Sequence, residues 1–459
     1  MDRILQFLSD YATDLTYEKL PPEVIHQVKR RTIDGLGCAM GAYMETPAKI
    51  ARSLALEVTS NPGATVLGTH HHTSPELAAF ANGVMVRYLD FNDTGMALEA
   101  GHPSDNIPPV LAAAEYAGTD GPTAITGIVL AYEVQGRFGE PVHFRSRGWD
   151  HTTCVAISAA AGAGKALGLT REQMANALAL ATTANISLIQ LRMGTLSMWK
   201  GCAAGNASRN GVFAARLASR GLTGPGEVFE GRGGFLKQIT GPIELPSFGG
   251  NGRMFKVQDA KFKYFPTDYE AQCAFHPALE LREALGGRTD DIEKIIIHTY
   301  GVAVTAAADS PDKWDPTTRE TADHSLPYVL AVAFTKGAIW LDDFTEESIR
   351  NPELRPLMKK IEVYEEEEYT KAFPEANCFR IEVITRSGER HVREIRYAKG
   401  HPKNPMTDQE IETKFRRLVE PVMGSSQTNS ILDRIWHMEE VKEMREILTL
   451  FELKSGSKA

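Results

Sequence analysis

The chain has 459 residues, of which 42% are hydrophobic and 24% are charged, and its formal net charge is −9. This is the composition of an ordinary globular protein with room for two or three domains. The acidic balance, without any lysine- or arginine-rich block, argues against nucleic acids and anionic membranes as partners, although a local cationic pocket can still bind an anion.

The cysteines and the first residues indicate the compartment. Five cysteines are scattered without any C-x-x-C pair, which favours a reducing environment and argues against disulfides or an iron–sulfur cluster. The opening MDRILQFLSDYATDL carries three aspartates and resembles neither a signal peptide nor a transit peptide. No stretch reaches the ~18 apolar residues of a membrane span. We therefore expect a cytoplasmic protein.

Helical periodicity dominates the first 260 residues. Many of these segments are rich in alanine and glycine, as in AISAAAGAGKALG, and such small residues let helix backbones approach closely. The pattern predicts helices over residues 21–42, 47–58, 76–88, 106–116, 124–139, 153–168, 173–183 and 206–219. We expect Thr46 to be the N-cap of the second of these helices, and Thr170 to open a capping box with Gln173.

The pattern changes after residue 264. Strands are predicted at residues 292–300, 361–364, 379–385 and 389–397, the last two as a hairpin, with helices at 271–284 and 325–336. Amphipathic helix returns from residue 408 to the end. We predict a mainly α protein in which both chain ends (1–264 and 403–459) form a large all-helical domain, with an inserted smaller α+β lid domain (265–402). The cleft between two domains is a favoured place for a small-molecule site.

A polar segment interrupts the helical pattern at residues 88–106. It reads YLDFNDTG and, after a short gap, GHPSDN, and it includes Asp90, Thr94 and His102. A polar loop between two core helices can lie at the mouth of a cavity. The alternative interpretation is a simple helix cap supplied by Ser104 or Asp105.

Three further segments place polar groups next to apolar helices. In RGWDHTT, His151 precedes an Ala/Gly helix, and the alternative is an N-cap at Thr152 or Thr153. Lys200 stands alone in a nearly uncharged stretch after Arg192, so it either snorkels to solvent or holds an anion. In ETADHSLPY, Tyr328 is either functional or an ordinary core tyrosine with one hydrogen bond.

Cofactor signatures are missing from the sequence. The run His70–His72 cannot direct three side chains at one ion from a single helix or strand face. No G-x-S-x-G elbow and no phosphate loop occurs. We therefore expect neither a metal nor an organic cofactor.

The remaining groups suit proton abstraction next to a carboxylate. Asp90 and His102 are candidate bases, while Lys200, His151 and Arg192 are candidate partners for carboxylates. Removing such a proton adds charge to an existing anion, so preorganised donors must stabilise the enediolate-like species. An acid must also protonate any departing hydroxide.

The same segments resemble the 2-methylcitrate dehydratase family (MmgE/PrpD) over nearly the whole chain. The matching segments are RYLDFNDT with GHPSDN, GWDHTT, GTLSMWKGCAAGNASRNGVFAARLASRGLTGP, KYFPTDYEAQ and ETADHSLPYVLAVA. The resemblance implies a split helical domain with an inserted lid, and a cofactor-independent, homodimeric enzyme acting on a polyacid. Family members dehydrate 2-methylcitrate, decarboxylate cis-aconitate or epimerise a related amino-diacid.

The resemblance also places the site. The family's active-site positions fall on Asp90, Thr94, His102, His151, Lys200 and Tyr328, which leaves Asp93, Ser104 and Asp105 as structural support. We expect a hydro-lyase that converts 2-methylcitrate to 2-methyl-aconitate in propionate breakdown. Asp90, His102 and Lys200 would be catalytic, and Thr94, His151, Tyr328 and Arg192 would bind substrate. The alternatives are a decarboxylase or isomerase on the same scaffold, or a non-catalytic polyacid-binding protein.

One position departs from the dehydratase pattern. Where the related dehydratases read FPAEYHAQ, this chain reads FPTDYEAQ, with Glu270 in place of the histidine. A glutamate facing the cleft would repel a tri-anion. This residue bears on the substrate and leaves the family resemblance intact.

Overall fold

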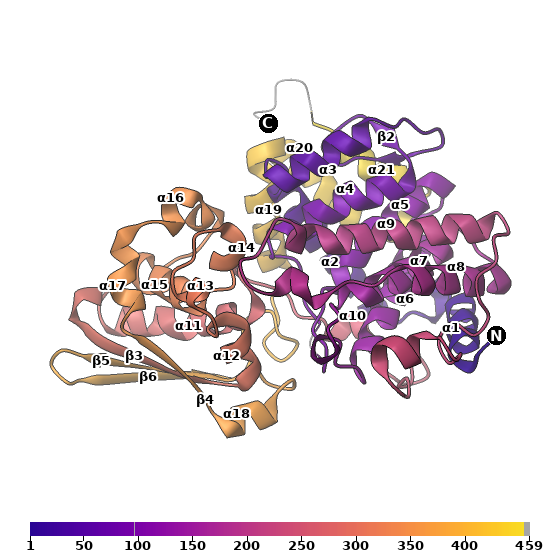
Figure 1. The fold of residues 1–459 in the computed structure, drawn as a ribbon. Helices are drawn as coiled ribbons and strands as arrows, with labels where there is room; N and C mark the ends of the chain where they lie inside the picture. The colour runs from indigo at the N-terminus through magenta and orange to yellow at the C-terminus, as the bar shows by residue number, and fades with distance from the viewer. Residues whose placement is uncertain (96, 454–459) are drawn as a thin grey trace. The chain divides into compact units, whose positions relative to one another are not determined.

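The computed structural model describes residues 1–95 and 97–453, and packing divides the chain into two compact units (Figure 1). The helical unit comprises residues 1–191, 201–261 and 407 onward, and the mixed unit comprises 192–200 and 262–406. The last six residues of the predicted segment 403–459 lie outside the described residues. The domain boundaries predicted at 264/265 and 402/403 stay a prediction.

The helical unit is built from both ends of the chain, as the predicted mainly α fold requires. Helix α19 (Asp408–Met423) packs along α2 (Pro22–Gly41), far from it in sequence. The other helices are α1 (Arg3–Asp14), α3 (Thr46–Leu56), α4 (Pro75–Tyr88), α5 (Ile107–Ala117), α6 (Gly121–Gly139), α7 (Thr152–Ala166), α8 (Arg171–Ala184), α9 (Trp199–Ser219, from its third residue), α10 (Lys256–Asp259), α20 (Ser425–Trp436) and α21 (Arg445–Leu448). A two-residue ladder, β1 (Ala64–Thr65) with β2 (His72–Thr73), is a small departure from an all-helical unit.

Small residues account for the dense packing of these helices. A Cβ placed on Gly127 of α6 would lie 2.9 Å from the carbonyl oxygen of Gly162 in α7. A Cβ on Gly83 of α4 would lie 2.9 Å from the Cα of Gly205 in α9. Real Cβ atoms do not tolerate such distances to backbone, so these helices pack closely only because glycine stands at the crossings.

The mixed unit contains a four-stranded sheet in the order β4-β3-β5-β6. Strands β3 (Ile292–Thr299) and β4 (Ile361–Glu365) are parallel, while β5 (Phe379–Thr385) is antiparallel to β3 and to β6 (Arg390–Ile395). The predicted hairpin is therefore confirmed. Helix α11 (Tyr269–Ala284) lies against β5 and β6, and α15 (Leu326–Lys336) packs on α11. The shorter helices are α12 (Gly301–Ala307), α13 (Pro311–Trp314), α14 (Arg319–Ala322), α16 (Glu346–Ile349), α17 (Arg355–Met358) and α18 (Glu367–Ala372).

Several predicted helix ends need correction. Helix α9 begins at Trp199, seven residues before the predicted start, so Lys200 lies in its first turn. Glu45, and not Thr46, is the N-cap of α3. The predicted Thr170–Gln173 capping box is confirmed. None of the described helices is long and apolar enough to span a membrane.

Candidate active site

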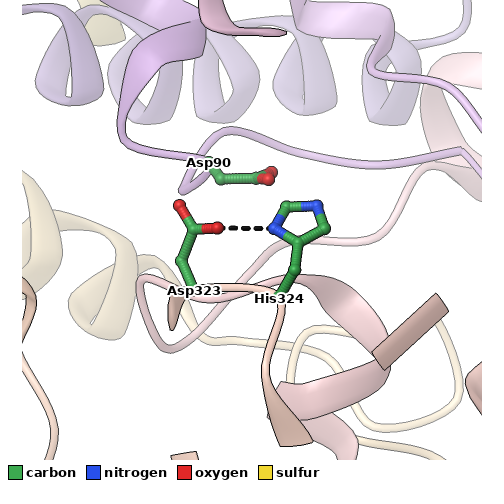
Figure 2. Close-up of side chains that lie close together, drawn as sticks. All are labelled: Asp90, Asp323 and His324. Carbon is green, nitrogen blue, oxygen red and sulfur yellow. Dashed lines mark hydrogen bonds and ion pairs between the residues drawn. The ribbon is translucent and has the colours of Figure 1, made fainter. Parts of the chain in front are cut away.

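Asp90 lies in the loop that follows α4, where it is labelled in Figure 2. Asp90 is only 1% exposed to solvent. Its carboxylate forms an ion pair of 2.9 Å with the guanidinium of Arg87, which is equally buried. Asp90 has a φ of +51°, in the left-handed region that non-glycine residues seldom adopt. Such strained positions cluster at functional sites, although aspartate tolerates this region better than most residues.

The hydrogen bonds of His102 define its tautomer. Nδ1 lies 2.8 Å from the carbonyl oxygen of Asp93, which can only accept, so Nδ1 carries the proton and donates. Nε2 lies 2.9 Å from Nη2 of Arg87 and therefore accepts from that guanidinium. Arg87 thus binds both Asp90 and His102. The lone pair through which His102 would act as a base is bonded to Arg87 in this arrangement.

The other polar residues of the segment hold its backbone. Asp93 accepts from the Ser104 amide at 2.9 Å and from the Tyr132 hydroxyl at 2.9 Å. The Asn92 side-chain amide donates to Ser104 Oγ and to Asp105 Oδ1. These contacts support the interpretation that Asp93, Ser104 and Asp105 are structural. Neither Ser104 nor Asp105 caps α5, whose N-cap is Asn106.

A buried ion pair supports the backbone next to Asp90. Lys414 of α19 lies 2.6 Å from the Asp34 carboxylate of α2, and both side chains are almost fully buried. The Lys414 ammonium also donates to the Phe91 carbonyl at 2.7 Å and lies 3.7 Å from the centre of the Phe91 ring. The C-terminal part of the chain therefore positions the residue that follows Asp90.

Thr94 and His151 lie close to His102 in the helical unit. The Thr94 hydroxyl donates to the Gly101 carbonyl at 3.1 Å, and Gly95 and Gly101 exchange backbone hydrogen bonds. The His151 and His102 rings have centroids 5.6 Å apart. His151 is the N-cap of α7, and the Asp150 carboxylate accepts from the Thr152 amide. The alternative prediction of an N-cap at Thr152 or Thr153 is therefore wrong.

Lys200 belongs to the mixed unit, where it contacts two residues that the sequence analysis did not select. Its residue is 2% exposed, so the snorkelling alternative is wrong. Lys200 Nζ lies 3.3 Å from Asp323 Oδ1 and 3.2 Å from His324 Nδ1. The Asp323 and His324 side chains point toward one another and form a hydrogen bond of 2.5 Å (Figure 2). The carboxylate therefore orients the imidazole, as in catalytic acid–base pairs.

The remaining candidates in the mixed unit have less suggestive surroundings. The Tyr328 side chain is fully buried, its hydroxyl donates to the Asp343 carbonyl, and burial raises its pKa. This is the bonding of an ordinary core tyrosine, and a role in substrate binding stays a prediction. Glu270 is buried in the first turn of α11. Arg192 ends a short 3₁₀ turn and is partly exposed.

The sequence carried a signal for the missed pair. Asp323 and His324 stand in the ETADHSLPY segment that drew attention to Tyr328, and two adjacent residues capable of acid–base chemistry are a stronger signal than one tyrosine. Arg87 was hidden because it lies inside the predicted helix 76–88, where an arginine suggests a solvated face.

The site contains buried acid–base groups paired with cations on a mainly α fold. Such an arrangement indicates an enzyme but does not identify the reaction. Residues 6–246 match the MmgE/PrpD N-terminal domain and residues 265–438 match the MmgE/PrpD C-terminal domain. The chain therefore belongs to the MmgE/PrpD family.

Relatives from three organisms show the range of activities in this family. The chain is 30% identical to the mitochondrial 2-methylcitrate dehydratase of Yarrowia lipolytica, with 81% of this chain and 74% of the relative covered. It is also 30% identical to the 2-methylcitrate dehydratase of Salmonella typhimurium, with 80% and 79% covered. The human cis-aconitate decarboxylase is 28% identical, with 94% and 91% covered. Dehydratases and decarboxylases are both lyases, and this chain is an enzyme of the lyase class.

Proposed function

We propose that the protein is a hydro-lyase that dehydrates 2-methylcitrate, or a similar tricarboxylate, to 2-methyl-aconitate without a metal or other cofactor. The observation that carries the proposal is the 30% identity to 2-methylcitrate dehydratases over about four fifths of the chain. With this activity, the enzyme would take part in propionate breakdown in the cytoplasm. We also propose a homodimer, which would have twice the mass of the chain by light scattering.

The proposed roles follow the geometry within each unit. Arg87 binds both groups, but a carboxylate has several lone pairs whereas the single basic lone pair of His102 is bonded to Arg87, so Asp90 is the preferred base in the helical unit. His102, Thr94 and His151 would bind and orient the substrate around it. In the mixed unit, Lys200 would hold a carboxylate, with Arg192 and Tyr328 as further contacts.

A panel of acids tests the reaction. The chelator-treated protein is incubated separately with 2-methylcitrate, citrate and cis-aconitate, while enoate absorbance and released CO2 are recorded. We expect absorbance to rise with 2-methylcitrate, no CO2 to appear, and the rate to be unchanged by the chelator. Thermal stabilisation by these acids without any product would instead indicate a non-catalytic binding protein.

The second candidate function is decarboxylation of cis-aconitate. It is favoured by the similarity to the human decarboxylase, which extends over 94% of this chain. Release of CO2 from cis-aconitate, faster than any enoate formation from 2-methylcitrate, would replace the first proposal with this one.

Lys200→Ala should lower kcat/KM on the true substrate by about 10- to 150-fold. The variant loses a charged hydrogen bond, and such bonds contribute about 1.5–3 kcal/mol, with each 1.36 kcal/mol corresponding to about tenfold in rate. The variant also removes one of the two partners of Asp323 and can lower stability, so steady-state kinetics is measured at a temperature where circular dichroism shows both proteins folded.

A second lysine provides the matched control. Lys165→Ala removes a half-buried lysine of α7 whose ammonium donates to the backbone carbonyls of Ala12 and Thr13. We expect its kcat/KM to stay within about threefold of wild type, as for a substitution that leaves transition-state contacts intact. Wild-type turnover by Lys200→Ala would make that lysine structural and the proposed role wrong.

A further inference from the structure

A cavity within the helical unit contains the carboxylate of Glu99, a residue to which no role has been given so far. The cavity has a volume of about 30 Å³, which is room for a group the size of a water molecule or a hydroxyl. Small residues at positions 95, 97, 100 and 101 and on α6 form much of its wall, together with Glu99, Gln135, His151 and Cys154. Part of this wall is therefore built from the same polar segment that carries Asp90 and His102.

Only one of the two carboxylate oxygens of Glu99 accepts a hydrogen bond from the described residues. Its side chain is 3% exposed, Oε2 accepts from the Arg145 amide at 3.2 Å, and Oε1 lies 3.7 Å from Arg145 Nε. Oε1 is fully buried and has no hydrogen-bond partner among the described residues. A buried carboxylate oxygen seldom lacks a hydrogen bond from the protein unless a ligand or a water molecule donates one.

Gln135 supplies the complementary group on the same wall. Its Oε1 accepts from the Asn106 side chain at 2.5 Å, which orients the amide and leaves Nε2 to donate elsewhere. Nε2 is buried and, within residues 1–95 and 97–453, has no acceptor. The cavity thus contains one buried acceptor or acid and one buried donor, and neither atom has a hydrogen-bond partner among the described residues.

The cavity adjoins the proposed catalytic residues of the helical unit. Its wall includes Gly101 and Pro103, the two neighbours of His102 in sequence, and His151, whose ring packs against that of His102. A ligand group in the cavity would therefore lie beside the residues proposed to bind the substrate.

The surroundings of Glu99 favour its protonated form near neutral pH. Burial raises the pKa of its carboxyl to about 7, an effect that the Arg145 guanidinium and amide partly oppose and the Asp150 carboxylate reinforces. The other titratable groups on the cavity wall are His151, Cys154, Lys256 and Asp259. Lys256 is paired with Asp259 and Glu140, so it does not neutralise Glu99. A carboxyl group that is protonated near pH 7 can act as a general acid.

We propose that Glu99 is a catalytic residue that donates its proton to the departing hydroxyl group of a hydroxy-polycarboxylate substrate, while the Gln135 amide binds the same oxygen. This inference rests on the proposed dehydratase function. It adds the acid that hydroxide departure requires and that the residues matched to the family leave unassigned.

The step balances without any co-reactant. The base removes the proton next to the carboxylate, and the electron pair of that C–H bond becomes the second bond of the alkene. The C–O bond breaks, its electron pair leaves with oxygen, and the Glu99 proton converts the departing hydroxide to water. Glu99 is left as a carboxylate, and the proton held by the base restores it after the product leaves.

Glu99→Gln tests the proposal with little change in shape. The new side-chain oxygen can still accept from the Arg145 amide, but the amide cannot release a proton at neutral pH. We expect kcat for dehydration to fall about 10²–10⁴-fold, the usual contribution of a general acid, with KM within about threefold of wild type. Equal melting temperatures would show that the fold is retained.

An analogue with chlorine in place of the substrate hydroxyl group separates acid catalysis from a structural role. Chloride leaves without a proton, so wild type and Glu99→Gln should eliminate it at rates within about threefold of each other. Equal loss on both substrates would overturn the proposal and make Glu99 structural. A Glu99→Gln variant that dehydrates the hydroxyl substrate at the wild-type rate would also overturn it.

The pH profile gives a second readout. The acid form of Glu99 is required, so kcat/KM of wild type should fall as pH rises through about 7. That alkaline fall should be absent with the chloro analogue and in Glu99→Gln. If wild type releases no water from any of the hydroxy acids, the proposed function has failed before Glu99 is tested, so the two failures are distinguishable.

Discussion

Asp90→Asn should lower kcat/KM by about 10²–10⁴-fold, the range expected when a general base is lost. Asparagine has nearly the same shape and, like aspartate, tolerates the left-handed backbone conformation that residue 90 adopts. Its side-chain oxygen can still accept from Arg87. The substitution therefore removes the basic carboxylate and leaves the loop in place, and steady-state kinetics with the substrate identified by the acid panel measures the effect.

Variants of the two imidazoles decide which group is the base. His102→Gln removes a ring whose Nε2 is already bonded to Arg87, so we expect a smaller loss of kcat than for Asp90→Asn, together with a change in KM. His324→Gln removes the ring that Asp323 orients. A loss of kcat in His324→Gln that exceeds the loss in Asp90→Asn would transfer the role of base to His324.

The fold was predictable because its main signals are local. Hydrophobic periodicity located the four strands of the mixed unit and most helices, and the Ala/Gly-rich segments predicted close crossings such as that of Gly127 with Gly162. The start of α9 was missed because residues 199–205 contain two glycines and no capping residue that marks a helix start. This error placed Lys200 in a loop, although it lies in a helix.

The chemistry of the candidate site was less predictable because it depends on contacts distant in sequence. Nothing in GHPSDN shows that Arg87 binds Nε2 of His102, a contact that fixes the tautomer. Likewise, Glu99 Oε1 lacks a hydrogen-bond partner among the described residues because of the way in which α6 and the loop after Phe144 surround it. Sequence patterns selected the polar segments, but the partner of each atom decides which residue can act as acid or base.

Lys414→Met should lower the free energy of unfolding by about 3–5 kcal/mol, the usual cost of removing one partner of a buried ion pair. Lys414 lies 2.6 Å from the Asp34 carboxylate, and the variant leaves that carboxylate buried without its cation. Urea unfolding followed by circular dichroism measures the effect. We expect a lower urea concentration at the midpoint and an unchanged dependence of the unfolding free energy on urea concentration. Because α2 and α19 come from opposite ends of the chain, the pair contributes to joining them.

A double variant isolates the electrostatic cause. Lys414→Met combined with Asp34→Leu replaces both charges with apolar groups, and such replacements are often neutral or stabilising, so most of the lost stability should return. If the double variant were as unstable as Lys414→Met alone, the loss would come from packing and not from the unpaired carboxylate.

The pH dependence of the single variant follows from the same burial. Burial raises the pKa of Asp34, and Lys414 opposes that rise, so without Lys414 the folded-state pKa must lie further above the unfolded value. A carboxyl group with a raised folded-state pKa contributes stability below its unfolded pKa and loses it as pH rises through the folded pKa. The stability gap between wild type and Lys414→Met should therefore narrow as pH falls from 8 to 5. A gap that stays constant over this range would show that Asp34 does not take up a proton in the variant, and that water or another cation has replaced Lys414.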